Sequence, residues 1–195
     1  MVPTASPEAI DRPPVVEVEP AGKAAFSLSR ALAVPLLAYL ASRVIMTFAI
    51  GLATVAGRHS LHYVVTVWDG RWYEKIALHG YPHAVPQGDF YAGTGSNAQS
   101  AVAFFPLYPL LMRALDRILP GGADVAGVVL SLLLGALATV LVWFVAEKVA
   151  GRRVADRAAV LFAFSPGAFV LSLVYAEGLL IVLSAGCMLA LLDRR

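Results

Sequence analysis

Charged residues are scarce in this chain, and their scarcity sets the first limit on what it can be. Only 14% of its 195 residues are Asp, Glu, Lys or Arg, whereas about 25% is usual for a soluble domain, whose surface must face water. Hydrophobic residues make up 59% of the chain, and the mean hydropathy is +0.74. We therefore expect a protein of the lipid bilayer rather than a water-soluble domain.

Cysteines and basic runs are scarce as well. The single cysteine, Cys187, lies inside an apolar run, which excludes an intrachain disulfide and a metal site built from cysteine and histidine. The net charge is only +2, and no basic run is interleaved with aromatic residues, so nothing favours binding to nucleic acid. Scattered histidines with a lone aspartate form no metal-binding pattern. We assign no metal ligand and no cofactor, and the need for a divalent ion stays open.

Long hydrophobic runs, in contrast, are abundant. Residues 1–30 are polar and proline-rich without a helical or strand period, and we expect a disordered cytoplasmic tail there. The apolar run behind this tail starts too late and is too long for a cleaved signal peptide, which favours a membrane anchor. We expect an all-α polytopic membrane bundle over residues 31–195. Its four predicted spans are 31–55, 123–146, 158–174 and 178–192.

The second predicted span carries small residues in a regular stripe. Ser131, Gly135 and Thr139 recur at four-residue spacing, which places them on one side of a helix. Small side chains on one side let another helix approach closely in lipid. We therefore expect this span to pack tightly against a neighbour.

Basic residues in short loops indicate the cytoplasmic side of a membrane protein. The short segment between the second and third predicted spans carries Lys148, Arg152, Arg153 and Arg157. Residues 57–122 would then form a long first extracytoplasmic loop. Within this loop, residues 104–119 are apolar at first and amphipathic later, with two early prolines, so we expect a short or interfacial helix rather than a span.

The most charged and aromatic passage is WDGRWYEKIALHGYP, residues 68–82. On a helical wheel its aromatic side separates from a polar side that carries Arg71, Glu74 and Lys75. Such an amphipathic helix is expected to lie in the membrane interface, where Trp and Tyr are favoured. The aromatic side consists of Trp68, Trp72, Tyr73, Ile76 and His79.

Asp69 falls on that aromatic side, where an unpaired carboxylate is costly. Two interpretations fit this position. In the first, Thr66 is an N-cap and Asp69 completes a capping box, worth roughly 1 kcal/mol. In the second, Asp69 is a general base close to cationic groups that meet an anionic phosphate. Those groups would be drawn from Arg71, Lys75, His79 and His83.

Arg43 lies near the middle of the first predicted span, where facing hydrocarbon would cost at least about 3 kcal/mol. It must therefore face the bundle interior or reach the interface. We expect either a pair with Glu177, at the outer end of the third span, or contact with a substrate phosphate. For Glu177 itself, an interfacial acid that ends a helix is favoured over a catalytic group. Ser165 and Pro166, in the middle of the third span, predict a kink.

Three motifs in order carry a resemblance to a known family. WDGRWY with HGYP, then AFFPLYPLL, then SPGAFVLSLVYAEGLL together resemble the first half of the PIG-V family of mannosyltransferases. The resemblance implies a GT-C-like polytopic glycosyltransferase that moves a mannose-like sugar from a polyprenyl-phosphate donor outside the cytoplasm. Its acceptor would be a lipid or a glycan. No cofactor besides the lipid-linked donor is implied.

In that superfamily an acidic residue of the first extracytoplasmic loop is the usual catalytic candidate, and Asp69 occupies the matching position. The implied mechanism is inverting, with Asp69 taking a proton from the acceptor hydroxyl and cations stabilising the leaving phosphate. Arg71 is the first candidate for that cation and Arg43 the second. The residues expected to bind substrate are Arg71, Trp68, Trp72, Tyr73, Lys75, His79, Arg43 and Glu177.

Enzymes of this kind are longer and have more spans, so we expect this chain to be an amino-terminal half or to work with a partner half. The expected location is the cell membrane, in a bacterial plasma membrane, since the alanine-rich chain has no Asn-x-Ser/Thr acceptor, or in the endoplasmic reticulum if the chain is eukaryotic. The alternative is a non-catalytic polytopic subunit or lipid transporter. The two hypotheses separate at Asp69, because a helix cap tolerates Asn there and a general base does not.

Overall fold

The computed structural model describes residues 21–81, 83, 101 and 103–194, with side chains from Ala31 onward. The chain divides into two compact units, Met1–Ala31 and Leu32–Arg195. Of the first unit, only the start of a helix is described. Most of the predicted disordered tail lies outside the described residues, and the first helix begins at Ala21 rather than at residue 31. The arrangement below concerns the second unit.

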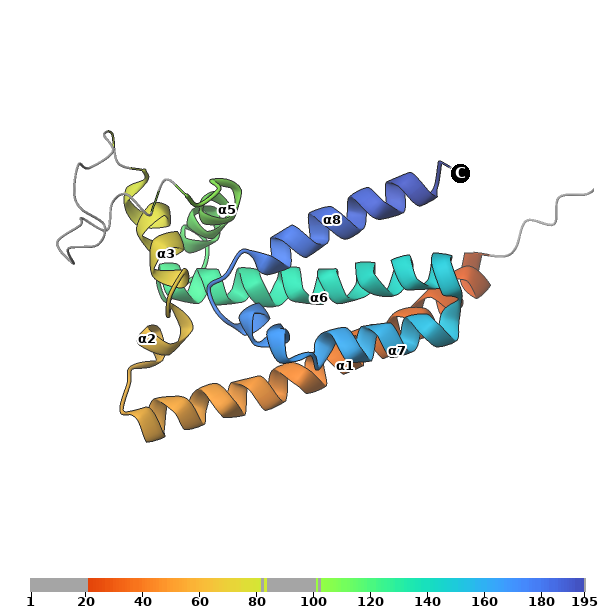
Figure 1. The fold of residues 1–195 in the computed structure, drawn as a ribbon, viewed down its shortest axis with the longest axis horizontal. Coiled ribbons are helices and arrows are strands. Elements are labelled where there is room, and N and C mark those ends of the chain that lie inside the picture. Colours follow the sequence, from red (N-terminus) through yellow and green to blue (C-terminus); the bar gives the residue numbers. More distant parts are fainter. Residues whose placement is uncertain (1–20, 82, 84–100, 102, 195) are drawn as a thin grey trace, which may run out of the picture. The chain divides into compact units, whose positions relative to one another are not determined.

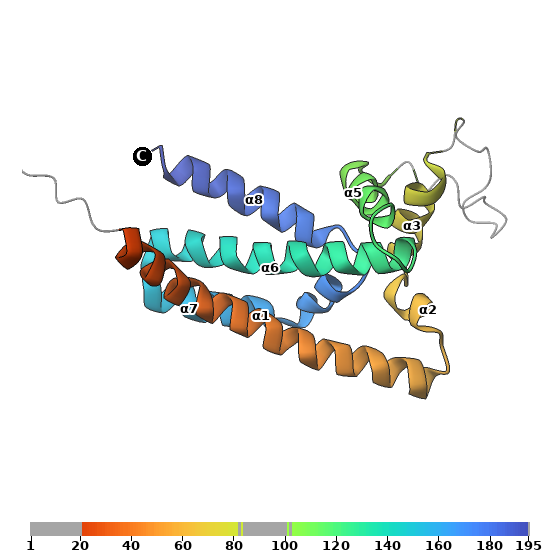
Figure 2. The same cartoon turned by 180° about the vertical axis from the view of Figure 1, so that it is seen from behind.

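The described residues form helices and no strands, as the sequence predicts. In chain order these are α1 (Ala21–Gly57), α2 (Leu61–Val65), α3 (Gly70–His79), α5 (Leu107–Asp116), α6 (Ala123–Ala150), α7 (Arg152–Ala163), the 3-10 helix η2 (Pro166–Ser172) and α8 (Glu177–Leu192). Figures 1 and 2 show α6 between α7 and α8, with α3 and α5 at the end of α6 where that helix begins.

The small-residue stripe of α6 packs as predicted. Ser131, Gly135 and Thr139 are all buried. A Cβ added at Gly135 would lie 2.4 Å from the hydroxyl of Tyr39, which donates a hydrogen bond to the Leu132 carbonyl at 2.8 Å. The absence of a side chain at Gly135 therefore lets Tyr39 of α1 reach the backbone of α6.

Two helical segments, Ala31–Gly57 and Ala123–Ala150, are long and apolar enough to cross a membrane. The third predicted span is broken, because α7 and η2 meet at an angle of 70° and count as one span only together. Pro166 has no N–H to continue the helix, which confirms the predicted kink. The described part of the chain thus has two or three candidate spans, fewer than the four predicted.

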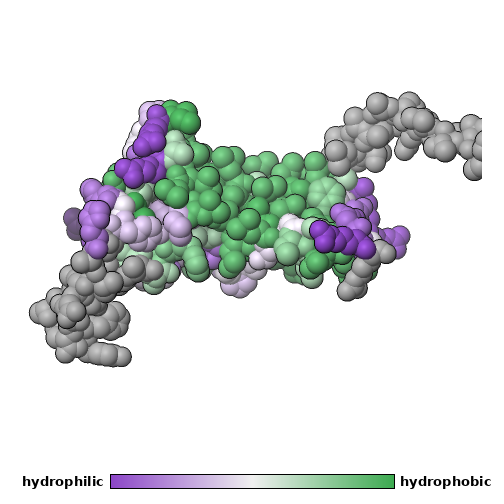
Figure 3. All heavy atoms as spheres, turned by 90° about the horizontal axis from the view of Figure 1, so that it is seen from above, coloured by the Kyte–Doolittle hydropathy of each residue, from purple (hydrophilic) through white to green (hydrophobic). Residues whose placement is uncertain are grey.

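The fourth predicted span falls short for a simple reason of length. Helix α8 has 16 residues, about 24 Å at 1.5 Å per residue, against a hydrocarbon core of roughly 30 Å. The surface of the molecule is nevertheless suited to a lipid bilayer. The face drawn in Figure 3 is a continuous hydrophobic surface, with hydrophilic residues gathered at its two ends. These features are those of a helical membrane protein.

The turn between α6 and α7 is shorter than the basic turn predicted at 147–157. Helix α6 continues to Ala150 and α7 begins at Arg152, so that Gly151 alone, with φ of +81°, reverses the chain. The basic side chains therefore lie on the ends of two helices, opposite the end of α6 that contacts α2, α3 and α5. Lys148 forms an ion pair with Asp193 at this end.

Arg43 is buried and bound to the broken third segment, not to Glu177. Its Nη1 donates to the Ala168 carbonyl at 2.8 Å and to the Ser172 hydroxyl at 2.7 Å. Its Nη2 donates to the Ala163 carbonyl at 3.4 Å. The break between α7 and η2 leaves carbonyls that a regular helix would have used, and the guanidinium binds them. The expected pair of Arg43 with Glu177 is wrong for this reason.

The predicted extracytoplasmic loop at 57–122 contains three of the helices. The expected short helix within 104–119 is present as α5. Helix α3 buries Ile76 and Ala77, and Ala77 belongs to a core that includes Tyr108 and Met112 of α5, so part of the helix packs on protein. It therefore does not simply lie in the interface as the wheel suggested.

Candidate functional site

The passage before α3 is held by an extended segment that follows η2. The Val174 N–H donates to the Val65 carbonyl at 2.9 Å, and the Tyr175 hydroxyl donates to the Val67 carbonyl at 3.1 Å. We call these two hydrogen bonds the tyrosine clamp. The clamp holds the backbone just before Trp68 and Asp69 against the extended segment.

A close contact at Gly70 completes this arrangement. Gly70 is buried, and a Cβ added to it would lie 3.1 Å from the Val174 carbonyl oxygen and 3.4 Å from that of Val65. Only glycine lets the start of α3 approach the extended segment so closely. Trp68 has a positive φ of +54°, unusual for a bulky residue, and its ring is exposed.

Asp69 begins α3 without capping it, and the capping-box interpretation is wrong. Ser60 is the N-cap of the preceding helix α2, with its hydroxyl accepting the Tyr63 N–H. Thr66 ends α2, and its hydroxyl donates to the His62 carbonyl at 2.7 Å. The Asp69 side chain makes no capping hydrogen bond, and it has no hydrogen-bond or ion-pair partner within the described part of the chain.

The charges of Asp69 and Glu177 both act on two tyrosines, Tyr73 and Tyr175. Burial, followed by the negative charges of Glu177 and Asp69, raises the pKa of Tyr73 to about 12. Burial raises the pKa of Tyr175 to about 12, with Asp69 the larger of two charge effects and Glu177 the smaller. We call Asp69, Tyr73, Tyr175 and Glu177 the carboxylate cluster. It combines two acids with two hydroxyls that stay protonated at neutral pH.

Glu177 lies at the first residue of α8, outside the predicted span at 178–192. Burial raises the pKa of its carboxyl, a backbone hydrogen bond opposes that rise, and the charge of Asp69 adds to it. The expectation that Glu177 ends the third span is therefore replaced by a position at the start of α8. Its charge acts on the same tyrosines as the charge of Asp69 does.

An apolar groove leads away from the carboxylate cluster. This cavity has a volume of about 490 Å³ and is lined by α5 and α8, through residues such as Leu107, Leu180 and Leu183. Tyr73 and Glu177 are its polar lining residues near the cluster. A groove of this kind suits a long hydrocarbon chain whose polar end lies at the carboxylates.

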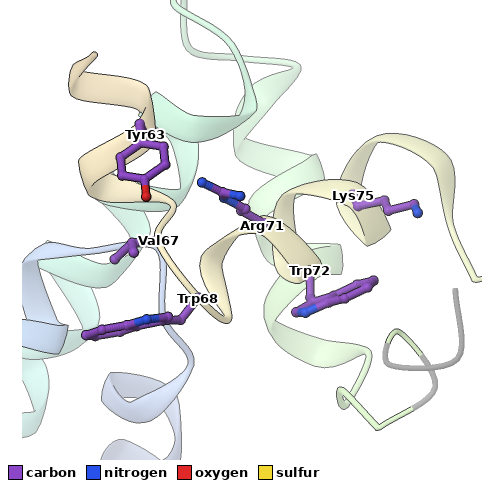
Figure 4. A pocket seen from close by; sticks show the side chains of 6 residues that line it. All are labelled: Tyr63, Val67, Trp68, Arg71, Trp72 and Lys75. Carbon is purple, nitrogen blue, oxygen red and sulfur yellow. The ribbon is translucent and has the colours of Figure 1, made fainter. Parts of the chain in front are cut away.

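A second cavity lies on another face of α3. Figure 4 shows this cationic pocket, of about 380 Å³, lined by Tyr63, Val67, Trp68, Arg71, Trp72 and Lys75. The Arg71 guanidinium carbon lies 4.7 Å from the centre of the Tyr63 ring, and the Lys75 Nζ lies 5.6 Å from that of Trp72. Cations held against aromatic faces are suited to a phosphate group or another anion.

The structure therefore divides the predicted site residues among three places. Asp69, Tyr73 and Glu177 belong to the carboxylate cluster, whereas Arg71, Lys75 and the two tryptophans line the cationic pocket. Asp69 and Arg71 are two positions apart, about 200° around a helix, which explains their separation. Arg43 is bound to α7 and η2 instead. His79 and His83 are both exposed and line neither cavity.

Sequence analysis missed several residues that complete the two cavities. Tyr63 and Val67 line the cationic pocket, and Tyr175 holds the clamp. Tyr108 contacts Tyr73 edge-on, with ring centroids 4.8 Å apart. For Tyr175 a signal was present, since it lies two residues before Glu177 where the apolar runs are interrupted.

In comparisons with known proteins, no family model, no curated protein and no solved structure matches this chain. The resemblance to the PIG-V family thus rests on the three sequence motifs.

Proposed function

We propose that this protein is a membrane glycosyltransferase that moves a mannose-like sugar from a polyprenyl-phosphate donor to a lipid or glycan acceptor. The observation that carries the proposal is the position of Asp69. The backbone before Asp69 is held by the tyrosine clamp, its exposed carboxylate has no partner among the described residues, and its charge acts on Glu177, which lines an apolar groove. A general base needs this combination of fixed position and free oxygen atoms.

The proposed reaction is a single displacement with inversion. Asp69 accepts the proton of an acceptor hydroxyl as that oxygen attacks the anomeric carbon of the donor sugar. The bond between that carbon and the phosphate oxygen breaks, and polyprenyl phosphate leaves with the bonding electrons. The tyrosines of the cluster stay protonated at neutral pH, because their pKa values are raised to about 12, so they can donate hydrogen bonds to sugar hydroxyls.

The two cavities suit the two ends of such a donor. The apolar groove between α5 and α8 accommodates part of the polyprenyl chain within the membrane. Arg71 lies in the first turn of α3 and Asp69 immediately before that helix, so the donor would have to extend around the start of α3, with its phosphate at Arg71 and its sugar at Asp69. Arg71 is the proposed partner of the leaving phosphate, with Lys75 in the same pocket.

The proposed topology follows from the distribution of charge along α6. The basic residues at 148–157 lie at one end of that helix, and the carboxylate cluster lies with the helices that pack on its other end. If the basic end is cytoplasmic, the reaction takes place on the extracytoplasmic side. In this topology, α7 with η2 forms a third, broken span, and α8 forms a fourth that is short.

The test is transfer of radiolabelled mannose from polyprenyl-phosphate mannose by membranes that contain the full-length protein. Asp69→Asn keeps the size of the side chain and removes its basicity, so we expect transfer to fall by about 10²- to 10⁴-fold at unchanged protein abundance. Asp116→Asn, at the end of α5 in the same loop, is the matched control and should transfer normally.

Two other outcomes would contradict the proposal. Equal transfer by wild type and Asp69→Asn would show that Asp69 is not the base, and the Glu177→Gln variant would then be assayed. No transfer by wild type from mannose, glucose or arabinose donors would favour the non-catalytic subunit or lipid transporter.

A further inference from the structure

Three side chains that could bind a metal ion converge where α2, α3 and α6 meet. They are His62 of α2, Glu74 of α3 and Asp124 in the first turn of α6. His62 Nδ1 lies 3.1 Å from Asp124 Oδ2, and His62 Nε2 lies 3.6 Å from Glu74 Oε2. One ligand atom from each residue lies within 4.8 Å of the others. Residues far apart in the sequence thus meet at a single point.

The chemistry of this set suits a transition metal. Zinc binds imidazole nitrogen and carboxylate oxygen at about 2.0–2.2 Å, which places neighbouring ligand atoms roughly 3–3.6 Å apart. The separations of 3.1 Å and 3.6 Å are of that size but involve different nitrogens of the His62 ring, so the ring and the carboxylates would have to turn for one nitrogen and both acids to bind one ion. The nitrogen ligand favours zinc over calcium and magnesium, which prefer all-oxygen sites, and the two carboxylates also suit manganese.

Burial and charge at this point also favour a cation. The side chains of Glu74 and Asp124 are only 18% and 24% exposed, whereas that of His62 is 53% exposed and leaves a path for an ion. Burial raises the pKa of Glu74, His62 opposes that rise and the charge of Asp124 adds to it. Among the residues that the structure describes, His62 is the sole ion-pair partner of the two acids.

We propose that His62, Glu74 and Asp124 bind one divalent transition-metal ion, of the class of Zn²⁺ or Mn²⁺, that fastens α2 and α3 to the start of α6. This site goes beyond the proposed function, because the ion touches none of the residues assigned to transfer. Its effect on the reaction is indirect. Glu74 lies on the helix that Asp69 precedes, so the ion would hold the helix next to the proposed base.

The test uses the full-length protein, purified in detergent with any affinity tag removed and treated with chelator. Zn²⁺ binding is measured by equilibrium dialysis and elemental analysis, and we expect one saturable ion per chain. His62→Ala and Asp124→Asn should each weaken binding at least about tenfold, a loss seen even for groups that only orient a metal ligand. Asp124→Asn keeps an oxygen for the Val125 N–H, which Asp124 Oδ1 accepts at 2.9 Å.

His59→Ala is the matched control, since His59 is an exposed histidine close by that stacks on Tyr63 at 4.5 Å. It should bind Zn²⁺ as wild type does. A second measurement does not depend on any variant folding, because it uses wild type loaded with Mn²⁺. Electron spin echo spectroscopy should show coupling of the manganese to a histidine nitrogen.

The proposal is overturned if wild type shows no saturable binding of either ion. It is equally overturned if bound Mn²⁺ shows no nitrogen coupling, or if folded His62→Ala and Asp124→Asn proteins bind like His59→Ala. None of these measurements requires sugar transfer, so failure of the proposed function and failure of the metal site are distinguishable.

Discussion

The surroundings of Arg43 and those of Asp69 use charge in opposite ways. Arg43 is buried in the middle of the bundle, and its guanidinium donates to the Ala168 carbonyl, the Ser172 hydroxyl and two further oxygens. Asp69 is exposed at the end of the bundle. There the backbone is bound by the tyrosine clamp, and the carboxylate has no partner in the part of the chain that is described.

This difference distinguishes a structural charge from an available one. A buried charge whose donors are all directed at protein oxygens stabilises the fold and has little left for a ligand. A carboxylate whose backbone is fixed, while its own oxygens remain free, can accept a proton without disturbing the fold. The sequence marks both residues as out of place, and only the packing separates their roles.

The largest expected effect on stability comes from Arg43→Ala. This variant leaves the Ala168 carbonyl and the Ser172 hydroxyl buried without their donor, and each such loss costs about 1–3 kcal/mol. We expect the free energy of unfolding in detergent to fall by about 3 kcal/mol, and Arg43→Lys to lose less because it keeps one donor. If Arg43→Ala instead loses transfer at unchanged stability, Arg43 binds substrate and the comparison with Asp69 breaks down.

A smaller effect is expected from Gly70→Ala, which strains the fixed backbone at Asp69. The added methyl group would press on the Val174 and Val65 carbonyls, and crowding of this kind costs about 1–3 kcal/mol. Because the strain falls next to Asp69, transfer should drop along with the unfolding free energy. Gly186→Ala is the control, since its Cβ would meet no atom within 4 Å and alanine suits a helix better. Normal transfer by Gly70→Ala would show that the close contact does not position the base.

The smallest expected effect is a dependence of stability on alkaline pH. In the folded protein the pKa values of Tyr73 and Tyr175 are about 12, above the ordinary value of 10, so the unfolded chain releases these protons first. Stability should therefore fall as pH rises from about 10 to about 12. After allowance for the partial exposure of Tyr73, the fall at pH 11 is at most about 1 kcal/mol per tyrosine.

The measurement compares the unfolding free energy of wild type with that of Tyr73→Phe and Tyr175→Phe across this pH range. Each variant should show a shallower decline than wild type, because the other titrating groups are common to all three proteins. Parallel curves would mean that the tyrosines ionise alike in folded and unfolded chains, which contradicts the effect of their burial and of the nearby carboxylate charges.

Much of the fold follows from patterns that are local in the sequence. Apolar runs predict helices of membrane character, the stripe at Ser131, Gly135 and Thr139 predicts a tight helix contact, and Pro166 predicts the break after α7. The number of spans was overestimated, because hydropathy detects the apolar character of residues 158–174 but not the 70° bend within them. The same bend frees the carbonyls that bind Arg43, so its partners could not be derived from charge pairing.

The candidate site is predicted in part. The helical wheel singles out Asp69 and separates Tyr73 from Arg71 and Lys75, as the two cavities on α3 do, but it wrongly places Trp68 and Trp72 with Tyr73, since both line the cationic pocket. The tyrosine clamp could not be predicted, since its acceptors are the backbone carbonyls of Val65 and Val67, which carry no side-chain signature. Sequence alone could not predict the metal-binding group either, because only the tertiary fold brings His62, Glu74 and Asp124 together.

The left-handed backbone conformation at Trp68 stores conformational strain in the loop before α3. A bulky residue in this conformation costs roughly 1–2 kcal/mol, and the exposed ring, with 68% of its surface open, gains little from burial. The hydrogen bond from the Tyr175 hydroxyl to the Val67 carbonyl, directly before Trp68, opposes relaxation of this backbone. The position of Asp69, the proposed base, therefore depends on a hydroxyl more than one hundred residues away in the sequence.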